Sequence, residues 1–224
     1  MTKKTFQGIE LLPDQMPAKQ LFILLHSVGS KPSDLVPLAK YLKEVFPGAA
    51  FLLPEGTEPF EGDNGRQWFS ISGVTEENRV ARVAEAMPAL HALVKHAQDR
   101  FGVLQSDTAL IGFSQGAIMA LEFSIAHDGG VGRVLAFSGR FARLPEKAPE
   151  LTTLHLLHGE SDPVIPVAYA QAAIARLKEL NGDATLDIAA SAGHGINAEL
   201  ADHAIRRLQT HIPLRSWKKA MEGA

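Results

Sequence analysis

The sequence predicts an α/β fold, in which a mostly parallel β-sheet is covered by helices on both faces. Short apolar runs alternate with segments of helical periodicity along the chain, as parallel sheets with helical crossovers require. The apolar runs are nearly continuous, which is typical of strands buried on both faces. A length of 224 residues suits one such unit, so we expect residues 1–224 to form a single domain.

The apolar runs and the helical patterns give the order of the elements. A short antiparallel strand is expected near residues 6–12, before the main strands. The main strands are expected at residues 21–25, 49–53, 108–111, 134–137, 153–157 and 185–189. Helices are expected at about 33–45, 76–100, 116–127, 166–181 and 197–211. Strand and helix therefore alternate as in a doubly wound sheet.

Two stretches depart from a simple strand or helix pattern. The helical pattern at 76–100 follows Thr75, a suitable N-cap, and contains Pro88, which predicts a kink or a break. Residues 54–75 form the longest irregular stretch and are rich in Gly, Pro and charged residues. Because long ordered loops in compact domains are often functional, we expect this stretch to form a wall or partial cover of an active site.

Composition narrows the class of protein. Hydrophobic residues make up 46% and charged residues 21%, and a net charge of −3 provides no basic field for nucleic acid or anionic membrane. The absence of cysteine excludes disulfides, thiolate metal sites and cysteine nucleophiles. No segment has the length and apolarity of a membrane span, and the N-terminal residues lack the apolar core of a signal peptide. We therefore expect a cytoplasmic protein, and no cofactor is expected from the motifs of the chain.

Residues 108–123 contain the most informative motif. An apolar strand pattern ends in Gly112-Phe-Ser-Gln-Gly116, and good helix formers follow from Ala117. Strand, G-x-S-x-G and helix in this order predict a nucleophile elbow, a tight turn that lifts a serine hydroxyl out of the sheet. Glycine is expected at 112 and 116 because a Cβ there would collide with a neighbouring strand or helix. Ser114 is therefore the expected catalytic nucleophile.

A serine hydroxyl becomes a good nucleophile only when an oriented base removes its proton. In hydrolases built on such sheets, the acid and then the histidine follow the nucleophile, on loops after later strands. The loop after the strand at 153–157 offers Asp162, with Glu160 as the local rival and a turn or capping role as the structural alternative for Asp162. The loop after the strand at 185–189 offers His194, with small residues on both sides.

The loop at residues 26–30, after the first main strand, is the expected source of one oxyanion donor. Two backbone N–H groups must point at the negative charge that develops on the tetrahedral intermediate. Gln115, next to the nucleophile, supplies one, and Val28 is the best candidate for the other. His26 and His158 lie at strand ends near the same face, where we expect them to shape loops by hydrogen bonding rather than to act as the base.

Trp68 and Phe69 lie in the irregular stretch, where two adjacent large apolar side chains are less expected than in a strand. One of them can line a substrate pocket while the other anchors the loop in the core. For each residue, core packing and pocket lining both remain open.

Together these motifs resemble the carboxylesterase, phospholipase and acyl-protein thioesterase branch of the α/β-hydrolases, nearly from end to end. The resemblance rests on His-x-x-Gly at 26–29, Gly-Phe-Ser-Gln-Gly at 112–116, His-Gly-x-x-Asp-Pro-Val at 158–164 and Gly-His at 193–194. It implies an α/β-hydrolase fold, a Ser114–His194–Asp162 triad and an oxyanion hole from Val28 and Gln115. It also implies no metal, activity on carboxylic esters of short acyl chains, and a monomer or homodimer.

One position departs from the family pattern. The family usually has glycine directly after the loop histidine, and here that residue is Ser27. If the position needs a conformation that only glycine adopts easily, the Val28 N–H would be misplaced. Losing one oxyanion donor typically costs about 3 kcal/mol, a factor of roughly 10² to 10³ in rate.

The sequence thus predicts a carboxylic ester hydrolase that forms an acyl-enzyme on Ser114 and takes a small-molecule ester as its substrate partner. An acyl thioesterase, acting on acyl-protein or acyl-CoA, is the alternative among enzymes because the same groups serve both reactions. A non-catalytic binding protein with the same fold is the alternative outside the enzymes, and Ser27 is the only residue that favours it.

Overall fold

The computed structural model describes residues 7–62 and 64–222, whose strands form a seven-stranded sheet and a small two-stranded ribbon. Across the sheet the order is β1-β3-β2-β6-β7-β8-β9, and all neighbours are parallel except β1 and β3. The strands are β1 (Gly8–Leu11), β2 (Gln20–Leu25), β3 (Ala49–Pro54), β6 (Thr108–Phe113), β7 (Arg133–Phe137), β8 (Thr153–Gly159) and β9 (Ala184–Ala189). The parallel sheet and its antiparallel first strand agree with the sequence prediction.

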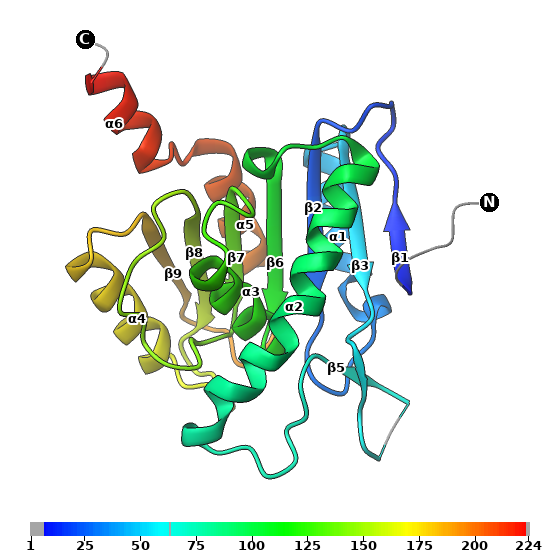
Figure 1. Ribbon diagram of the computed structural model, residues 1–224, viewed down its shortest axis with the longest axis vertical. Helices are drawn as coiled ribbons and strands as arrows, with labels where there is room; N and C mark the ends of the chain where they lie inside the picture. Colours follow the sequence, from blue (N-terminus) through cyan, green and yellow to red (C-terminus); the bar gives the residue numbers. More distant parts are fainter. Residues whose placement is uncertain (1–6, 63, 223–224) are drawn as a thin grey trace.

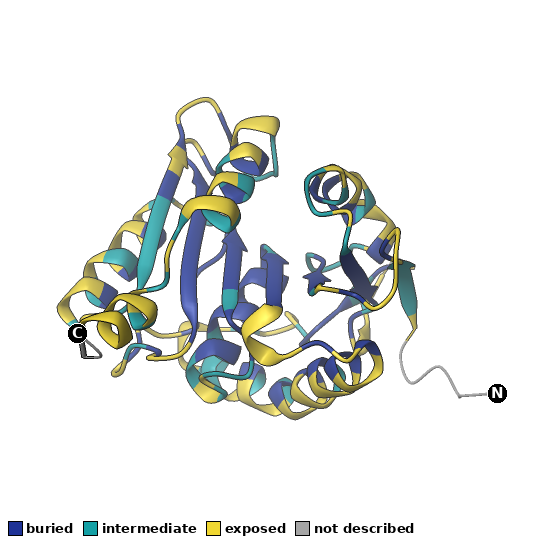
Figure 2. Ribbon diagram, turned by 90° about the horizontal axis from the view of Figure 1, so that it is seen from above, coloured by how far each residue is buried: buried dark blue, intermediate teal, exposed yellow. Residues whose placement is uncertain are grey.

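Helices cover both faces of this sheet, as predicted, and Figure 2 shows the buried strands between helices whose outer sides are exposed. One face is covered by α1 (Val36–Val45), which follows the 3₁₀ turn η1 (Pro32–Leu35), and by α5 (Ala198–Thr210). The other face is covered by α2 (Glu76–Phe101), α3 (Gln115–Ala126) and α4 (Ala168–Glu179). A second 3₁₀ turn, η2 (Gln105–Asp107), leads into β6.

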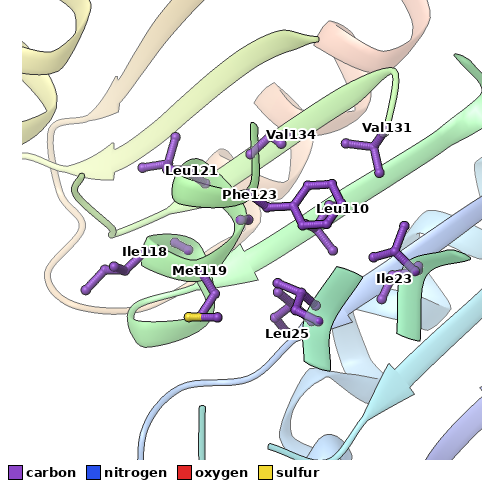
Figure 3. Close-up of a cluster of buried hydrophobic side chains, with 14 of the residues drawn as sticks. Ile23, Leu25, Leu110, Ile118, Met119, Leu121, Phe123, Val131 and Val134 are labelled. Atoms are coloured by element: carbon purple, nitrogen blue, oxygen red, sulfur yellow. The ribbon is translucent and has the colours of Figure 1, made fainter. Parts of the chain in front are cut away.

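The central strand β6 contributes to both hydrophobic cores. Leu110 packs on the face covered by α3, together with Met119 and Phe123 (Figure 3), whereas Ala109 and Ile111 pack on the opposite face. Successive side chains of a strand point to opposite faces, so a strand covered on both sides needs apolar residues at every position. This is the physical origin of the continuous apolar runs in the sequence.

The helix α2 begins as predicted but does not break at Pro88. Thr75 caps it, because the Thr75 hydroxyl accepts a hydrogen bond of 3.2 Å from the Asn78 N–H. The helix then continues as one element through Pro88 to Phe101, so the predicted break, one of the two outcomes expected there, is wrong. Met87 and Leu90, on either side of the proline, are both buried. Their packing against the core offsets the hydrogen bond that proline cannot donate.

The stretch at 54–75 contains two short strands that the sequence did not predict. β4 (Glu58–Pro59) and β5 (Arg66–Gln67) pair as an antiparallel ribbon. Arg66 also forms an isolated antiparallel bridge with Ser30, so the ribbon is joined to the loop after β2. Strands of two residues show no recognisable periodicity, which is why only their tertiary partners reveal them.

A further helix, α6 (Leu214–Glu222), was also absent from the sequence prediction. In Figure 1 it projects at the end of the sheet where the parallel strands begin, opposite the edge where they end. Its first backbone N–H, at Leu214, donates to the Asp183 carboxylate at 2.9 Å, and the same carboxylate lies 3.0 Å from His211 Nε2. Within the described residues, no helix is long and apolar enough to cross a membrane.

His155 belongs to the polar cluster at this junction and is fully buried. Arg133 donates from Nη1 to His155 Nε2 at 3.0 Å and from Nη2 to the His211 carbonyl at 2.8 Å. Burial, together with the neighbouring charge of Arg133, lowers the pKa of His155 to about 3. The imidazole therefore stays neutral in the folded protein at all moderately acidic pH values.

This burial predicts a pH dependence of stability. Between pH 6.5 and about 3, His155 binds a proton in the unfolded chain but not in the folded one, so stability falls as pH falls through this window. Replacing His155 with Gln removes this proton-linked contribution. The free energy of unfolding should then decrease between pH 7 and pH 5 by about 2 kcal/mol less in the variant than in the wild type. Urea unfolding at both pH values measures this. His91→Gln, at an exposed histidine on α2, is the control; equal pH losses in the His155 variant and the wild type would contradict the assignment.

Candidate active site

The backbone turn after β6 has the strained geometry expected of a nucleophile elbow. Ser114 has φ 53° and ψ −112°, a conformation that non-glycine residues rarely adopt, and α3 begins at the next residue. A Cβ on Gly116 would lie 2.1 Å from the Leu25 carbonyl oxygen, and one on Gly112 would lie 2.2 Å from the Gly116 carbonyl oxygen. Both glycines are therefore required by close backbone approaches, as the sequence predicted.

Three side chains that the sequence singled out lie in one hydrogen-bonded chain. The Ser114 hydroxyl is 3.0 Å from His194 Nε2, and His194 Nδ1 is 2.8 Å from Asp162 Oδ2. Because an ionised carboxylate can only accept, Nδ1 must carry the proton, which leaves Nε2 free to accept from the serine. The arrangement has the geometry of a nucleophile, a base and a group that orients the base.

Asp162 is held by its own loop as well as by His194. Its Oδ1 accepts from the Val164 and Ile165 backbone N–H groups at 2.8 and 2.9 Å. Burial by itself would raise the pKa of Asp162, but the hydrogen bonds from His194 and these two amides outweigh it and lower the pKa. Oδ1 thus accepts the backbone hydrogen bonds of the turn, while Oδ2 accepts from His194. The rival Glu160 is exposed.

His158 and His26 occupy structural positions, as predicted. His158 Nε2 lies 2.7 Å from the Ile165 carbonyl oxygen and 3.3 Å from Asp162 Oδ2, so it braces the loop that carries the aspartate. His26 is fully buried, accepts from the Gly56 N–H at 2.9 Å through Nε2, and has Nδ1 2.7 Å from the Ser27 carbonyl oxygen. Burial lowers the pKa of His26, which favours the neutral ring that these contacts need.

The loop that carries Val28 is fixed at both ends. His26 holds one end, and on the other side the Gly29 N–H donates to the Arg66 carbonyl while the Arg66 N–H donates to Ser30, both at 2.9 Å. Among the residues described, Ser27 is not one of those with a positive φ. The serine therefore does not occupy a conformation that would need glycine, so the backbone strain considered for this position is absent.

The Gln115 side chain has a structural role that the sequence analysis did not anticipate. Its Oε1 accepts from the Trp68 N–H at 2.8 Å, and its Nε2 donates to the Phe69 carbonyl at 2.7 Å. The Trp68 indole N–H in turn donates to the His26 carbonyl at 2.8 Å. Gln115 therefore fastens the 68–69 segment to the first turn of α3. No local pattern signals this contact, because its partner lies 47 residues away.

Trp68 and Phe69 themselves are largely buried, with exposed fractions of 1% and 4%. Both belong to the hydrophobic core that contains Ile118 of α3 and Met87 of α2. Their side chains thus back the candidate site from the core side. A role of either ring in lining a substrate pocket remains a prediction.

Residues 8–212 match the family described as phospholipase/carboxylesterase, and the chain belongs to this family. It is a carboxylesterase-type hydrolase of the α/β-hydrolase fold. Over 94% of its length it is 44% identical to Esterase YpfH of Escherichia coli (strain K12), covering 90% of that protein. It is 28% identical to Acyl-protein thioesterase 1 of Saccharomyces cerevisiae, with 71% of this chain and 78% of the relative covered.

Solved structures agree with this assignment. The crystal structure of esterase PE8 superposes with a TM-score of 0.84 at 32% identity, covering 92% of this chain and 99% of that one. The Bacillus cereus carboxylesterase superposes with a TM-score of 0.77, covering 92% of this chain and 95% of that one. Its identity of 18% makes it evidence for the fold alone.

Because the backbones approach so closely at the elbow, adding one methyl group at Gly116 should lower stability strongly. In Gly116→Ala the new Cβ would overlap the Leu25 carbonyl oxygen, so we expect the free energy of unfolding to fall by about 3 kcal/mol, at the upper end of the usual cost of overpacking. Urea denaturation measures the change. Gly195→Ala is the matched control, since no atom lies within 4 Å of its added Cβ. Equal stability of the two variants would show that the elbow can relax around the methyl group.

The Gln115 side-chain hydrogen bonds also predict a loss of stability when they are removed. Gln115→Met keeps the side-chain length but leaves the Trp68 N–H and the Phe69 carbonyl without their partners. Each unsatisfied buried group costs about 1–3 kcal/mol, so thermal and urea unfolding should both show a loss of at least about 2 kcal/mol. Gln171→Met, at an exposed glutamine on α4, should change stability little. A stable Gln115 variant would mean that the 68–69 segment is held by packing alone.

Proposed function

We propose that this protein cleaves carboxylic esters of short acyl chains through an acyl-enzyme on Ser114, with His194 as base and Asp162 as its orienting acid. The observation that carries the proposal is the position of His194, whose two nitrogens lie 3.0 Å from the Ser114 hydroxyl and 2.8 Å from Asp162. The strained elbow supports it, because such strain is typical of functional sites.

In the first half-reaction, Ser114 Oγ attacks the ester carbonyl while His194 Nε2 takes its proton. The carbonyl oxygen becomes an oxyanion, and the backbone N–H groups of Gln115 and Val28 donate to it. The Gln115 N–H is suited to this role because it lies in the first turn of α3, where helix N–H groups lack intrahelical acceptors and the helix dipole favours negative charge. The tetrahedral intermediate collapses, and His194 returns the proton to the leaving alcohol.

In the second half-reaction, His194 removes a proton from a water molecule as its oxygen attacks the acyl-enzyme carbonyl. The resulting tetrahedral intermediate collapses, the bond to Ser114 Oγ breaks, and His194 returns the proton to that oxygen as the carboxylic acid is released. Asp162 keeps the imidazole in the tautomer that faces the serine and stabilises the imidazolium form in both halves. The lowered pKa of Asp162 supports this role, because the carboxylate stays ionised at neutral pH.

Hydrolysis of p-nitrophenyl esters from acetate to decanoate tests the proposal. The wild type should be most active on the short chains, and Ser114→Ala should lower kcat by at least about 10⁴-fold because it removes the nucleophile. Ser106→Ala, at an exposed serine of η2, is the control. A fluorophosphonate should label the wild type and not the Ser114 variant. Failure of the wild type to hydrolyse any ester or take the label would favour the non-catalytic binding protein.

A thioester substrate is the second candidate, supported by the relatives named acyl-protein thioesterase. The oxyanion and acyl-enzyme are common to both reactions, so the two candidates differ in the leaving group alone. Matched oxygen and thiol esters of one acyl chain, compared by kcat/KM, distinguish them. A higher kcat/KM for the thiol ester, beyond its greater intrinsic reactivity, would favour the thioesterase.

A further inference from the structure

The Phe113 side chain lies against the proposed base. Phe113 is the last residue of β6, and its ring centroid is 5.2 Å from that of the His194 imidazole, with 37° between the two ring planes. Aromatic rings at this separation are in contact. Because Phe113 comes immediately before Ser114, the end of β6 carries both the proposed nucleophile and a ring that contacts the proposed base.

The direction of the Phe113 ring follows from the pleat of the sheet. Ile111 packs in the core on the face covered by α1 and α5, and Phe113, two residues further along β6, packs against the same core. The loop that carries His194 leads into α5, and both Ala192 and Leu200 belong to that core. The Phe113 ring and the imidazole therefore meet on one face of the sheet.

The backbone around His194 does little to fix the imidazole. His194 stands between Gly193 and Gly195. A Cβ on Gly193 would meet the Ser161 carbonyl oxygen at 4.0 Å, and one on Gly195 would meet no described atom within 4 Å. Glycine adopts many backbone conformations, and open space at these positions does not restrict them. The orientation of the imidazole must therefore come from the groups that its ring contacts.

These contacts change during the proposed reaction. In the free enzyme the imidazole is hydrogen-bonded to Ser114 at 3.0 Å and to Asp162 at 2.8 Å, and it lies against the Phe113 ring. In the acyl-enzyme the Ser114 Oγ is an ester oxygen and has no proton to donate. The hydrogen bond to Asp162 and the contact with Phe113 then remain while His194 activates water.

We propose that Phe113 is a positioning residue for deacylation, in which its ring keeps the His194 imidazole directed at the attacking water. The assignment rests on the proposed acyl-enzyme mechanism. One hydrogen bond to Asp162 lets the imidazole swing about the bond, and the Phe113 ring blocks the swing toward β6. Because a small misplacement of a catalytic group slows a reaction strongly, loss of the ring slows deacylation more than acylation.

The two half-reactions can be timed separately. Release of p-nitrophenol by excess enzyme gives the acylation rate constant, and mass spectrometry of quenched acyl-enzyme gives the deacylation rate constant. In Phe113→Leu, deacylation should slow about tenfold and acylation less than about threefold. Phe113→Tyr keeps the ring and should retain both wild-type rate constants. Equal slowing of both steps in Phe113→Leu, or no slowing, would overturn the proposal.

Phe46→Leu is the matched control for these measurements. Phe46 is also a partly buried phenylalanine that packs against this core, but its ring contacts Phe22 at a centroid distance of 5.3 Å. Both rate constants should keep their wild-type values in Phe46→Leu. Slower deacylation in this variant would show that the core as a whole controls the step and would overturn the proposal.

An NMR measurement without turnover separates this proposal from the catalytic one. The His194 Nδ1 proton lies in the hydrogen bond to the buried Asp162 carboxylate, and such protons give a resonance at low field. Ser114→Ala removes the serine hydrogen bond, as acylation does. Adding Phe113→Leu to Ser114→Ala should speed exchange of this proton with water about tenfold. Unchanged exchange would overturn the proposal. Faster exchange with a wild type that hydrolyses no ester would contradict the proposed function while supporting the role of the ring.

A second substitution covers the case in which Phe113→Leu does not fold. Phe113→Met fills a similar space with a flexible side chain and has no rigid ring face. Slower deacylation and faster exchange of the Nδ1 proton are expected for it as well. Wild-type values of both quantities in Phe113→Met would overturn the proposal.

Discussion

The contact on which this site depends is the approach of the first turn of α3 to the end of β2. At Gly116 a Cβ would lie 2.1 Å from the Leu25 carbonyl oxygen and 2.8 Å from that of His26. The parallel strands β2 and β6 are paired at this point, with Leu25 opposite Gly112. This one close approach therefore sets the position of Ser114 relative to the loop that carries Val28. The nucleophile and the candidate oxyanion donors are thus positioned by the same backbone contact.

The parts of the molecule that the sequence could predict are those specified by local pattern. The strand expected at 108–111 is apolar from Ala109 to Ile111 because both faces are covered, and the elbow needs glycine where backbones touch. Asp162 and His194 could be placed from strand order alone, because parallel strands end at the same edge of the sheet. Their hydrogen bonds then follow from the loops that carry them.

The parts that could not be predicted depend on partners distant in sequence. The Gln115 amide binds a segment 47 residues away. A glutamine in the first turn of a helix does not by itself predict such a long-range hydrogen bond. The ribbon formed by Glu58–Pro59 and Arg66–Gln67 is too short for periodicity. At Pro88 the local rule predicted a kink or a break, but burial of the neighbouring residues kept the helix in one piece. In each case tertiary contacts outweigh the local signal.

The hydrogen bond from the Trp68 indole to the His26 carbonyl has a spectroscopic consequence. The chain has two tryptophans; Trp68 is 1% exposed beside the site, and Trp217 is 55% exposed on α6. A small ionic quencher such as iodide reaches Trp217 and leaves Trp68 emitting. The residual fluorescence then comes from a single indole attached to the loop that carries Val28. The fold thus contains its own optical reporter of the region around Ser114, without any added label.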